Sequence, residues 1–162
     1  MVIVLMGPAG AGKTTVGTAL AGQLGWTFVD ADDYHPPENL AKLKAGVALT
    51  DSDRGPWLEQ LRSLIARALD RREPMVLACS ALTAAYRVRL TDRLHPVRFV
   101  YLKTPSDVLA ARLACRRGHV AGPAILESQL ATLQEPTDEA LTLDGTADVT
   151  TNIGHIRLEF GV

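Results

Sequence analysis

The sequence has few cysteines, little net charge and no long apolar run, and each absence excludes a class of protein. Two cysteines in 162 residues cannot form a disulfide framework, so a reducing, cytoplasmic setting is expected. With a formal net charge of −1, nothing indicates a nucleic-acid-binding surface. The N-terminal apolar run spans about five residues, which is too short for a membrane span or a signal peptide. Partners must therefore be inferred from local motifs.

The chain alternates short apolar runs with amphipathic stretches, and it contains no internal repeat, linker or low-complexity segment. Strands alternating with helices are typical of an α/β fold with parallel strands. The length fits one domain, residues 1–162. Strands are predicted over residues 2–6, 27–30, 75–79, 98–102 and 140–143, and helices over residues 13–24, 37–44, 56–71, 84–94 and 148–160, with two more between residues 104 and 136.

A glycine-rich loop follows the first predicted strand. Its spacing, Gly7-x4-Gly12-Lys13-Thr14, matches a phosphate-binding loop, and the strand before it and the helix after it are the context that this motif requires. Glycines allow successive backbone N–H groups to turn toward a polyphosphate at the helix N-terminus. Lys13 would place its ammonium near the β- and γ-phosphates, and the Thr14 hydroxyl would bind Mg²⁺. A glycine turn without a ligand is the alternative, and the flanking strand and helix argue against it.

Aspartates follow the second predicted strand, at positions 30, 32 and 33. Because the carboxyl ends of parallel strands form the ligand-binding edge of a sheet, Asp30 and Asp32 are expected to face the phosphates. We expect Asp30 to hold Mg²⁺ through water and Asp32 to accept the proton of an acceptor hydroxyl. The alternative is an acidic turn, residues 30–33, that caps the helix beginning near Pro37.

Arg54 stands just before a predicted helix that begins at Pro56. A guanidinium recognises carboxylates through a planar fork, so this segment is predicted to form a substrate wall. A solvated surface arginine is the alternative. Trp57 falls on the apolar stripe of the same helix and is expected to be structural.

Residues 112–136 are predicted to form a helical lid. Arg112 and Arg116 lie one helical turn apart and are expected to close over ATP, where they would neutralise transition-state charge. Gly118 and Gly122 are the candidate hinges. The alternative is a basic cluster that merely offsets the dipole at the end of a helix.

Together these segments resemble those of the gluconate kinases (gluconokinases), a family of P-loop small-molecule kinases. The phosphate loop alone indicates only a superfamily. More specific are the aspartate-histidine-proline, aspartate-arginine-proline-tryptophan and cysteine-serine-alanine-leucine segments at residues 30–36, 53–57 and 79–82. The likeness extends from residue 6 to residue 136 and includes the segments 86–87, 99–102, 112–119 and 128–136.

The resemblance implies transfer of a phosphoryl group from ATP to the terminal hydroxyl of D-gluconate, giving 6-phospho-D-gluconate and ADP. It also implies a P-loop NTPase fold, in which a five-stranded parallel sheet is flanked by helices and carries a helical lid. ATP and Mg²⁺ are the expected cofactors. The enzyme is expected to be a cytoplasmic homodimer that binds neither nucleic acid nor membranes.

The resemblance also assigns roles to individual residues by their position in the motifs. Catalysis falls to Lys13, Asp32 and Arg116, and metal binding to Thr14 and Asp30. The residues expected to bind the sugar acid are Asp32, His35, Arg54, Ser80, Arg87 and His119. The residues expected to bind the nucleotide are Gly7, Gly10, Ala11, Gly12, Lys13, Thr14, Thr15, Arg112 and Arg116.

Some positions depart from the family pattern. Thr83 follows the cysteine-serine-alanine-leucine run where the family usually has lysine, so a charge contact to gluconate from this position is absent. Val120 and Leu130 stand where aromatic residues are common in the lid. Ala31 replaces a usual glycine, with little expected effect.

Two other functions fit parts of the sequence. A related small-molecule kinase, such as a shikimate kinase, would share the aspartate pair and a carboxylate-binding arginine, but residues 32–36 and 79–82 argue against it. A nucleotide-binding module without catalytic activity would be marked by Thr83. Retention of Lys13, Asp30 and Asp32 together argues against that function.

Overall fold

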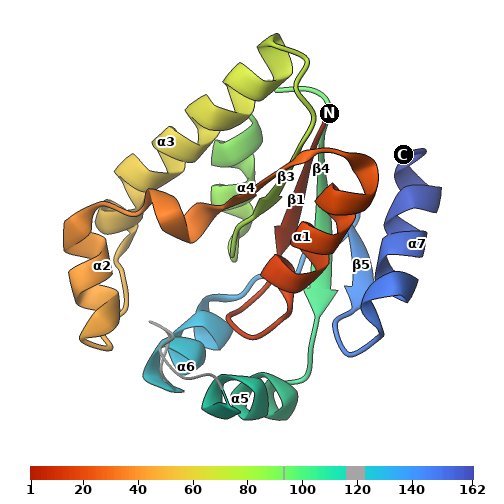
Figure 1. Ribbon diagram of the computed structural model, residues 1–162. Coiled ribbons are helices and arrows are strands. Elements are labelled where there is room, and N and C mark those ends of the chain that lie inside the picture. The colour runs from red at the N-terminus through yellow and green to blue at the C-terminus, as the bar shows by residue number, and fades with distance from the viewer. Residues whose placement is uncertain (93, 116–122) are drawn as a thin grey trace.

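Five parallel strands form one sheet in the computed structural model, which describes residues 1–92, 94–115 and 123–162 (Figure 1). Their order is β2-β3-β1-β4-β5, and every neighbouring pair is parallel. The predicted five-stranded parallel sheet flanked by helices is confirmed. The strands are β1 (Val2–Met6), β2 (Thr27–Asp30), β3 (Met75–Ala78), β4 (Val97–Lys103) and β5 (Ala140–Asp144).

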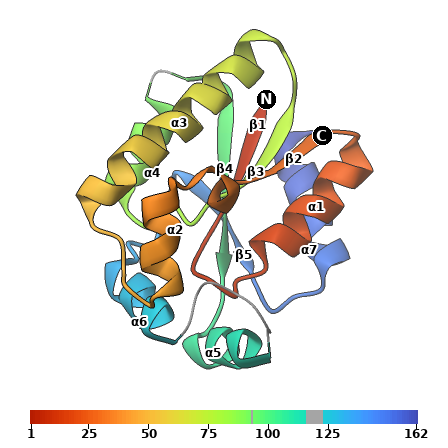
Figure 2. The same ribbon diagram turned by 60° about the vertical axis from the view of Figure 1, so that its left-hand side comes forward.

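Helices cover both faces of the sheet (Figure 1). On one face lie α1 (Lys13–Leu24) and α7 (Val149–Phe160), and on the other lie α3 (Asp51–Asp70) and α4 (Ala84–Thr91). The 3-10 helix η1 (Ala31–Tyr34) continues directly from β2. The remaining helices lie toward the carboxyl ends of the strands, as Figure 2 also shows, and are α2 (Pro37–Lys44), α5 (Ser106–Cys115) and α6 (Pro123–Thr132).

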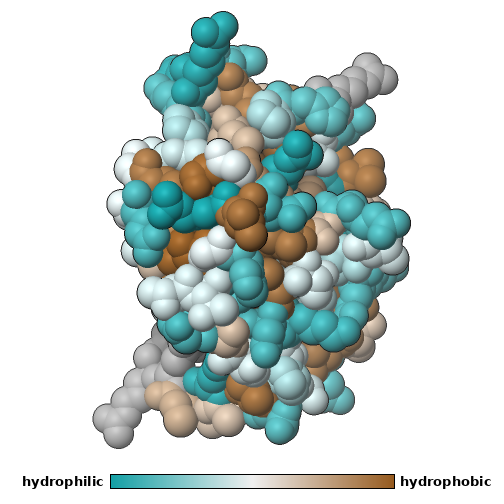
Figure 3. Space-filling view, turned by 90° about the vertical axis from the view of Figure 1, so that its right-hand side faces the viewer, coloured by the Kyte–Doolittle hydropathy of each residue, from teal (hydrophilic) through white to brown (hydrophobic). Residues whose placement is uncertain are grey.

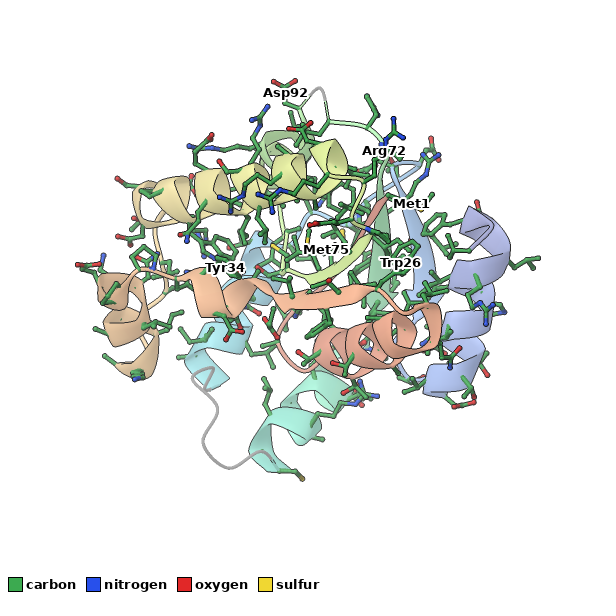
Figure 4. All side chains as sticks on the ribbon, turned by 45° about the horizontal axis from the view of Figure 1, so that its top comes forward. Met1, Trp26, Tyr34, Arg72, Met75 and Asp92 are labelled. Carbon is green, nitrogen blue, oxygen red and sulfur yellow. The ribbon has the colours of Figure 1, made fainter. Side chains whose placement is uncertain are left out.

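β1 runs through the middle of the sheet, between β3 and β4, and all five of its side chains are 0% exposed. A strand covered on both faces is expected to be a continuous apolar run, as this one is. Successive side chains point to opposite faces, so residues 2, 4 and 6 pack with α3, while residues 3 and 5 pack with α1 and α7. Met75, at the start of β3, lies beneath α3 in the same way (Figure 4).

The surface on the side of α7 mixes apolar and hydrophilic residues (Figure 3). Leu158 on α7 is 85% exposed, but single exposed apolar side chains are normal on soluble domains. Within the part of the chain that the structure describes, no helix combines the length and the apolar character that crossing a membrane requires.

The start of α3 differs from the prediction. The helix begins at Asp51 rather than Pro56, because Thr50 and Asp53 form a capping box in which each side chain accepts a hydrogen bond from the other residue's backbone N–H. Pro56 lies inside the helix and is exposed. Its fixed φ is compatible with a helix, but it cannot donate the usual backbone hydrogen bond. The capping box therefore sets the start of the helix.

Most other element boundaries agree with the sequence pattern. α1 and α2 begin and end at the predicted residues. α4 ends at Thr91 rather than Leu94, and β3 ends at Ala78, one residue before Cys79. Asp148 caps α7 by accepting a hydrogen bond from the backbone N–H of Thr150, so the helix itself begins at Val149.

Replacing Thr50 tests whether the capping box holds the first turns of α3. Thr50→Ala removes the hydroxyl that accepts from Asp53 N–H, so we expect the free energy of unfolding to fall by about 1 kcal/mol. Urea denaturation followed by circular dichroism measures this loss. Ser52→Ala, an exposed position in the same turn, is the matched control. An equal loss in both variants would contradict the capping role.

Candidate active site

The glycines of the phosphate loop hold backbone conformations that other residues avoid. The φ angles of Gly7, Gly10 and Gly12 are 138°, 86° and 97°. A Cβ on Gly7 would lie 3.2 Å from the carbonyl oxygen of Leu102 on β4, and one on Gly10 would lie 3.1 Å from that of Leu109 on α5. The loop is therefore shaped by glycine both for its backbone angles and for its close approach to β4 and α5.

The loop leads into the N-terminus of α1. Gly12 is the N-cap and offers no side chain to cap the helix, and no acidic residue lies in the first turn. Such a helix N-terminus favours a bound anion. The Lys13 ammonium donates hydrogen bonds to the carbonyl oxygens of Gly7 and Pro8, both at 2.9 Å. A cation is thus held over the loop where phosphates are expected.

Thr14 and Asp30 meet across α1 and β2. The Thr14 hydroxyl donates to Asp30 Oδ2 at 2.9 Å, although 16 residues separate the two in sequence. A hydroxyl beside a carboxylate offers the hard oxygen ligands that Mg²⁺ prefers. Among the described residues, no group of three or more His, Cys, Asp or Glu side chains could hold a metal. The Thr14 and Asp30 oxygens fit Mg²⁺, which binds one or two protein ligands together with substrate phosphates.

Asp30 also caps η1, since its Oδ1 accepts a hydrogen bond from Asp32 N–H at 3.1 Å. The alternative of an acidic turn that caps the helix near Pro37 is wrong, because α2 has no side-chain cap and Asp30 caps η1 instead. N-capping of η1 uses one carboxylate oxygen, and the Thr14 hydroxyl donates to the other. Asp32 remains exposed, with 73% of its side chain accessible.

A cleft of about 430 Å³ opens beside the phosphate loop. It is bounded by the loop, the carboxyl ends of β2 and β3, and residues of α2, α3, α4 and α6. Burial raises the pKa of the Cys79 thiol in its wall to about 12, so this cysteine stays protonated and inert. The expected site residues that line the cleft are Gly10, Gly12, Lys13, Thr14, Asp30, Asp32, His35, Arg54 and Ser80.

His35 is fixed against α3. Its imidazole stacks on Trp57 with ring centroids 4.4 Å apart, and its Nε2 lies 3.8 Å from Asp32 Oδ1. Trp57 in turn donates from its indole N–H to the carbonyl oxygen of Ala31 at 2.8 Å. The His35 side chain is only 5% exposed, and burial lowers its pKa despite the nearby Asp32 carboxylate. Trp57 is buried, as predicted, and it also supports the turn that carries Asp32.

Arg54 lies in the wall of the cleft with Tyr86, and both residues contact Asp51, which lies outside that wall. Arg54 Nη1 donates to the Tyr86 hydroxyl at 3.2 Å, and the guanidinium carbon lies 5.6 Å from the centre of the Tyr86 ring. The Tyr86 hydroxyl donates to Asp51 Oδ1. The Arg54 side chain is 17% exposed, so the alternative of a freely solvated surface arginine is not supported. Tyr86 was not predicted as a site residue, although segment 86–87 belongs to the family resemblance, because the resemblance gave a substrate role to Arg87 and none to its neighbour.

Gln129 is a second cleft residue that was not predicted as a site residue, although it lies in segment 128–136 of the family resemblance. It lies on α6 and lines the cleft, and its side-chain oxygen accepts a hydrogen bond from Ala9 N–H in the phosphate loop at 2.7 Å. The two residues are 120 positions apart. The contact links the predicted lid region directly to the loop.

The expected role of Arg87 in binding substrate is not supported. Arg87 is 3% exposed and is absent from the cleft wall. Its Nε and Nη2 donate to Glu139 Oε1, and its Nη1 donates to the carbonyl oxygens of residues 81, 82 and 134. With all three guanidinium nitrogens used, Arg87 ties α4 to the segment after α6. We therefore assign it a structural role.

A second cleft, of about 530 Å³, lies next to the first. Both clefts include Gly10 and Gly12, so the phosphate loop forms their common wall. Arg112 lines the second cleft and donates to the carbonyl oxygens of Gly10 and Gly145, at 3.1 and 3.0 Å. The expected nucleotide-binding residues Ala11 and Thr15 also line this cleft. Arg116, His119 and the candidate hinges Gly118 and Gly122 lie outside the described residues, as does Val120.

Known proteins share the fold of this chain and a large part of its sequence. A family model described as an AAA domain matches residues 2–136. The gluconokinase of Gluconobacter oxydans is 44% identical over 137 residues, which is 85% of this chain and 77% of that protein. This chain belongs to the gluconokinase family. The resemblance drawn from the motifs is thereby confirmed.

Solved structures give the gluconokinase family the same architecture. A sugar kinase from Janibacter sp. matches with a TM-score of 0.92 and 34% identity, over 99% of this chain and 94% of that one. A gluconokinase from Sinorhizobium meliloti matches with a TM-score of 0.82 and 35% identity, over 98% and 95%. Shikimate kinase from Aquifex aeolicus, with a TM-score of 0.63 and 18% identity over 99% and 96%, shares the fold alone. The shikimate kinase alternative is therefore not favoured.

The burial of His35 predicts a pH dependence of stability in this gluconokinase-family chain. Because its pKa is lowered in the folded state, the unfolded chain binds a proton first as the pH falls, and stability decreases below the ordinary histidine pKa of about 6.5. His35→Phe keeps the stack on Trp57 and removes the titration. We expect urea denaturation at pH 7.5 and 5.5 to show a larger loss for the parent than for the variant.

The control for this experiment is His155→Gln, which removes an exposed histidine from α7. It is expected to lose as much stability between the two pH values as the parent. If His35→Phe also loses as much as the parent, His35 does not cause the decrease.

Proposed function

We propose that this chain is a gluconokinase, which transfers the γ-phosphoryl group of ATP to the terminal hydroxyl of D-gluconate and releases 6-phospho-D-gluconate and ADP. One observation carries the proposal. A single cleft brings the phosphate-loop residues Lys13 and Thr14 together with a carboxylate, Asp32, and a guanidinium, Arg54. The cleft thus offers a phosphate cradle, a proton acceptor and a carboxylate-binding group, as phosphorylation of a sugar acid requires.

The nucleotide would span both clefts. The second cleft would hold the nucleoside, and the phosphates would cross the shared wall at Gly10 and Gly12 into the first cleft. Backbone N–H groups of the loop and the Lys13 ammonium would bind them. Arg112 supports this wall through its bonds to Gly10 and Gly145. We further propose that residues 112–136 act as the lid and that Arg116 contacts the phosphates.

Thr14 and Asp30 would hold Mg²⁺, Asp30 through water. Mg²⁺ held by these two residues would supply positive charge that offsets the charge developing on the phosphates. The exposed carboxylate of Asp32 would accept the proton of the attacking hydroxyl. His35, 3.8 Å from Asp32, and Ser80 would contact the sugar chain, and Arg54 would bind its carboxylate.

Assignments beyond the reaction rest on the family resemblance. They are a role in carbohydrate metabolism, a cytoplasmic location and a homodimer. The two cysteines, Cys79 and Cys115, are free, which suits a reducing compartment. A module without catalytic activity is not supported, because Lys13, Thr14, Asp30 and Asp32 all line one cleft.

An acceptor screen tests the function. We expect ADP release from Mg²⁺-ATP to increase with D-gluconate and not with shikimate or nucleoside monophosphates. A coupled assay at saturating ATP measures the rate for each acceptor. Stimulation by shikimate instead of gluconate would support a different kinase, and stimulation by none would support the module without catalytic activity.

Replacing Asp32 tests the proton acceptor. Asp32→Asn keeps the size of the side chain and removes its basicity, so we expect kcat with gluconate to fall at least about 100-fold while the Kd for ATP stays within about twofold. Asp33→Asn, which removes the same charge from the neighbouring residue in the cleft wall, is the matched control. Full turnover by Asp32→Asn would exclude Asp32 as the base.

A further inference from the structure

Tyr86 joins Arg54 in the cleft wall, and together they already hold a carboxylate. Arg54 Nη1 donates to the Tyr86 hydroxyl at 3.2 Å, and that hydroxyl donates its own proton to Asp51 Oδ1. Arg54 Nη1 also lies 3.9 Å from the same Asp51 oxygen. A guanidinium and a phenol hydroxyl thus converge on one carboxylate oxygen. This is the donor set that a bound organic acid would need.

The three residues differ in where they lie. Arg54 and Tyr86 line the cleft, whereas Asp51 is absent from its wall and 89% of its side chain is exposed. Exposed carboxylates bind nearby cations weakly, because water competes for the same contacts. A carboxylate that enters the cleft can therefore replace the Asp51 carboxylate as the partner of Arg54 and Tyr86.

The Tyr86 hydroxyl is suited to donate a hydrogen bond to a bound carboxylate. Burial, followed by the hydrogen bond to Asp51, raises the pKa of Tyr86, so the hydroxyl keeps its proton at neutral pH. Arg54 is charged at every relevant pH. A carboxylate entering the cleft would meet one fixed positive charge and one neutral donor.

The start of α4 fixes the position of Tyr86. Thr83 is the N-cap of α4, and its hydroxyl accepts a hydrogen bond from Tyr86 N–H at 3.2 Å. The threonine that stands in place of the family's usual lysine therefore supplies no charge to the substrate. Its side chain instead anchors the backbone of Tyr86. Recognition of an acid by this wall then depends on Arg54 and Tyr86.

We propose that Tyr86 is a specificity residue that donates a hydrogen bond to the carboxylate of the sugar acid, in the place that Asp51 holds in this structure. The inference rests on the proposed function and names the recognition element within its acceptor site. The carboxylate of an acid can accept hydrogen bonds from both the Arg54 guanidinium and the Tyr86 hydroxyl. A neutral polyol of the same length carries no charge with which to displace Asp51 from the two donors, so it gains no hydrogen bond from this wall and binds more weakly than the acid.

Tyr86→Phe tests the proposal because it removes one oxygen and keeps the ring beneath Arg54. We expect KM for gluconate to rise about tenfold, with kcat within about twofold and KM for ATP unchanged. The ratio of kcat/KM for gluconate over the neutral polyol D-glucitol should fall by a similar factor. Tyr34→Phe, which removes a hydroxyl from the end of η1 outside the cleft wall, is the matched control and should match the parent (Figure 4).

Asp51→Asn tests the displacement separately. It removes the internal carboxylate charge that competes for Arg54 and Tyr86, so we expect KM for gluconate to stay equal or to fall. A rise in KM as large as that of Tyr86→Phe would mean that Asp51 holds Arg54 and Tyr86 in their active geometry. That result would overturn the proposal that the substrate carboxylate displaces Asp51. Thermal unfolding of each variant, followed by circular dichroism, shows whether the fold is retained.

The outcomes separate this inference from the proposed function. If the parent does not phosphorylate gluconate, the proposed function fails and the inference fails with it. If the parent is active and Tyr86→Phe keeps the parent's KM and its preference for gluconate over D-glucitol, only the inference is overturned. A fall in kcat without a change in KM would also overturn it, because that result places Tyr86 in the chemical step.

Discussion

The site depends on the glycines of the phosphate loop, which have positive φ angles and lie close to neighbouring backbone. Gly10 has a φ of 86° and lies so close to α5 that a Cβ would approach the Leu109 carbonyl oxygen to 3.1 Å. A side chain at this position would meet both the strained backbone angle and the close α5 backbone. Because both clefts use Gly10 and Gly12 as a common wall, this constraint sets where a nucleotide and an acceptor can meet. The remaining site residues are arranged around that wall.

Polar contacts over long sequence separations hold the elements around the loop. Thr14 bonds to Asp30, Ala9 bonds to Gln129, and Arg112 bonds to Gly10. The buried Arg87 ties α4 to the segment that follows α6, through the Glu139 carboxylate and the carbonyl group of Gln134. Buried charges of this kind are stable only when every donor has a partner, so the segments they join are held in one arrangement. The acceptor cleft takes its shape from elements fixed in this way.

Local patterns predicted the elements well where one signal acted alone. The apolar runs gave all five strands, and the bounds of α1 and α2 agree with their predictions. The start of α3 was predicted at Pro56, because a proline often begins a helix. The helix begins earlier, at Asp51, because Thr50 and Asp53 form a capping box. At Asp30 two local rules applied together. Its carboxylate caps η1 through one oxygen and accepts a hydrogen bond from the Thr14 hydroxyl through the other. Two local rules that compete at one residue cannot be ranked without the packed structure.

The sequence by itself determined the phosphate loop, because glycine spacing, Lys13 and Thr14 act through contiguous backbone. It also determined the family, through several short segments that occur together. Only the tertiary structure decided that Arg87 is structural, that Gln129 contacts the loop, and that Tyr86 lies against Arg54. These outcomes depend on which helix faces pack side by side at the carboxyl edge of the sheet. That packing is set by strand order and by buried contacts between distant residues, which no local periodicity records.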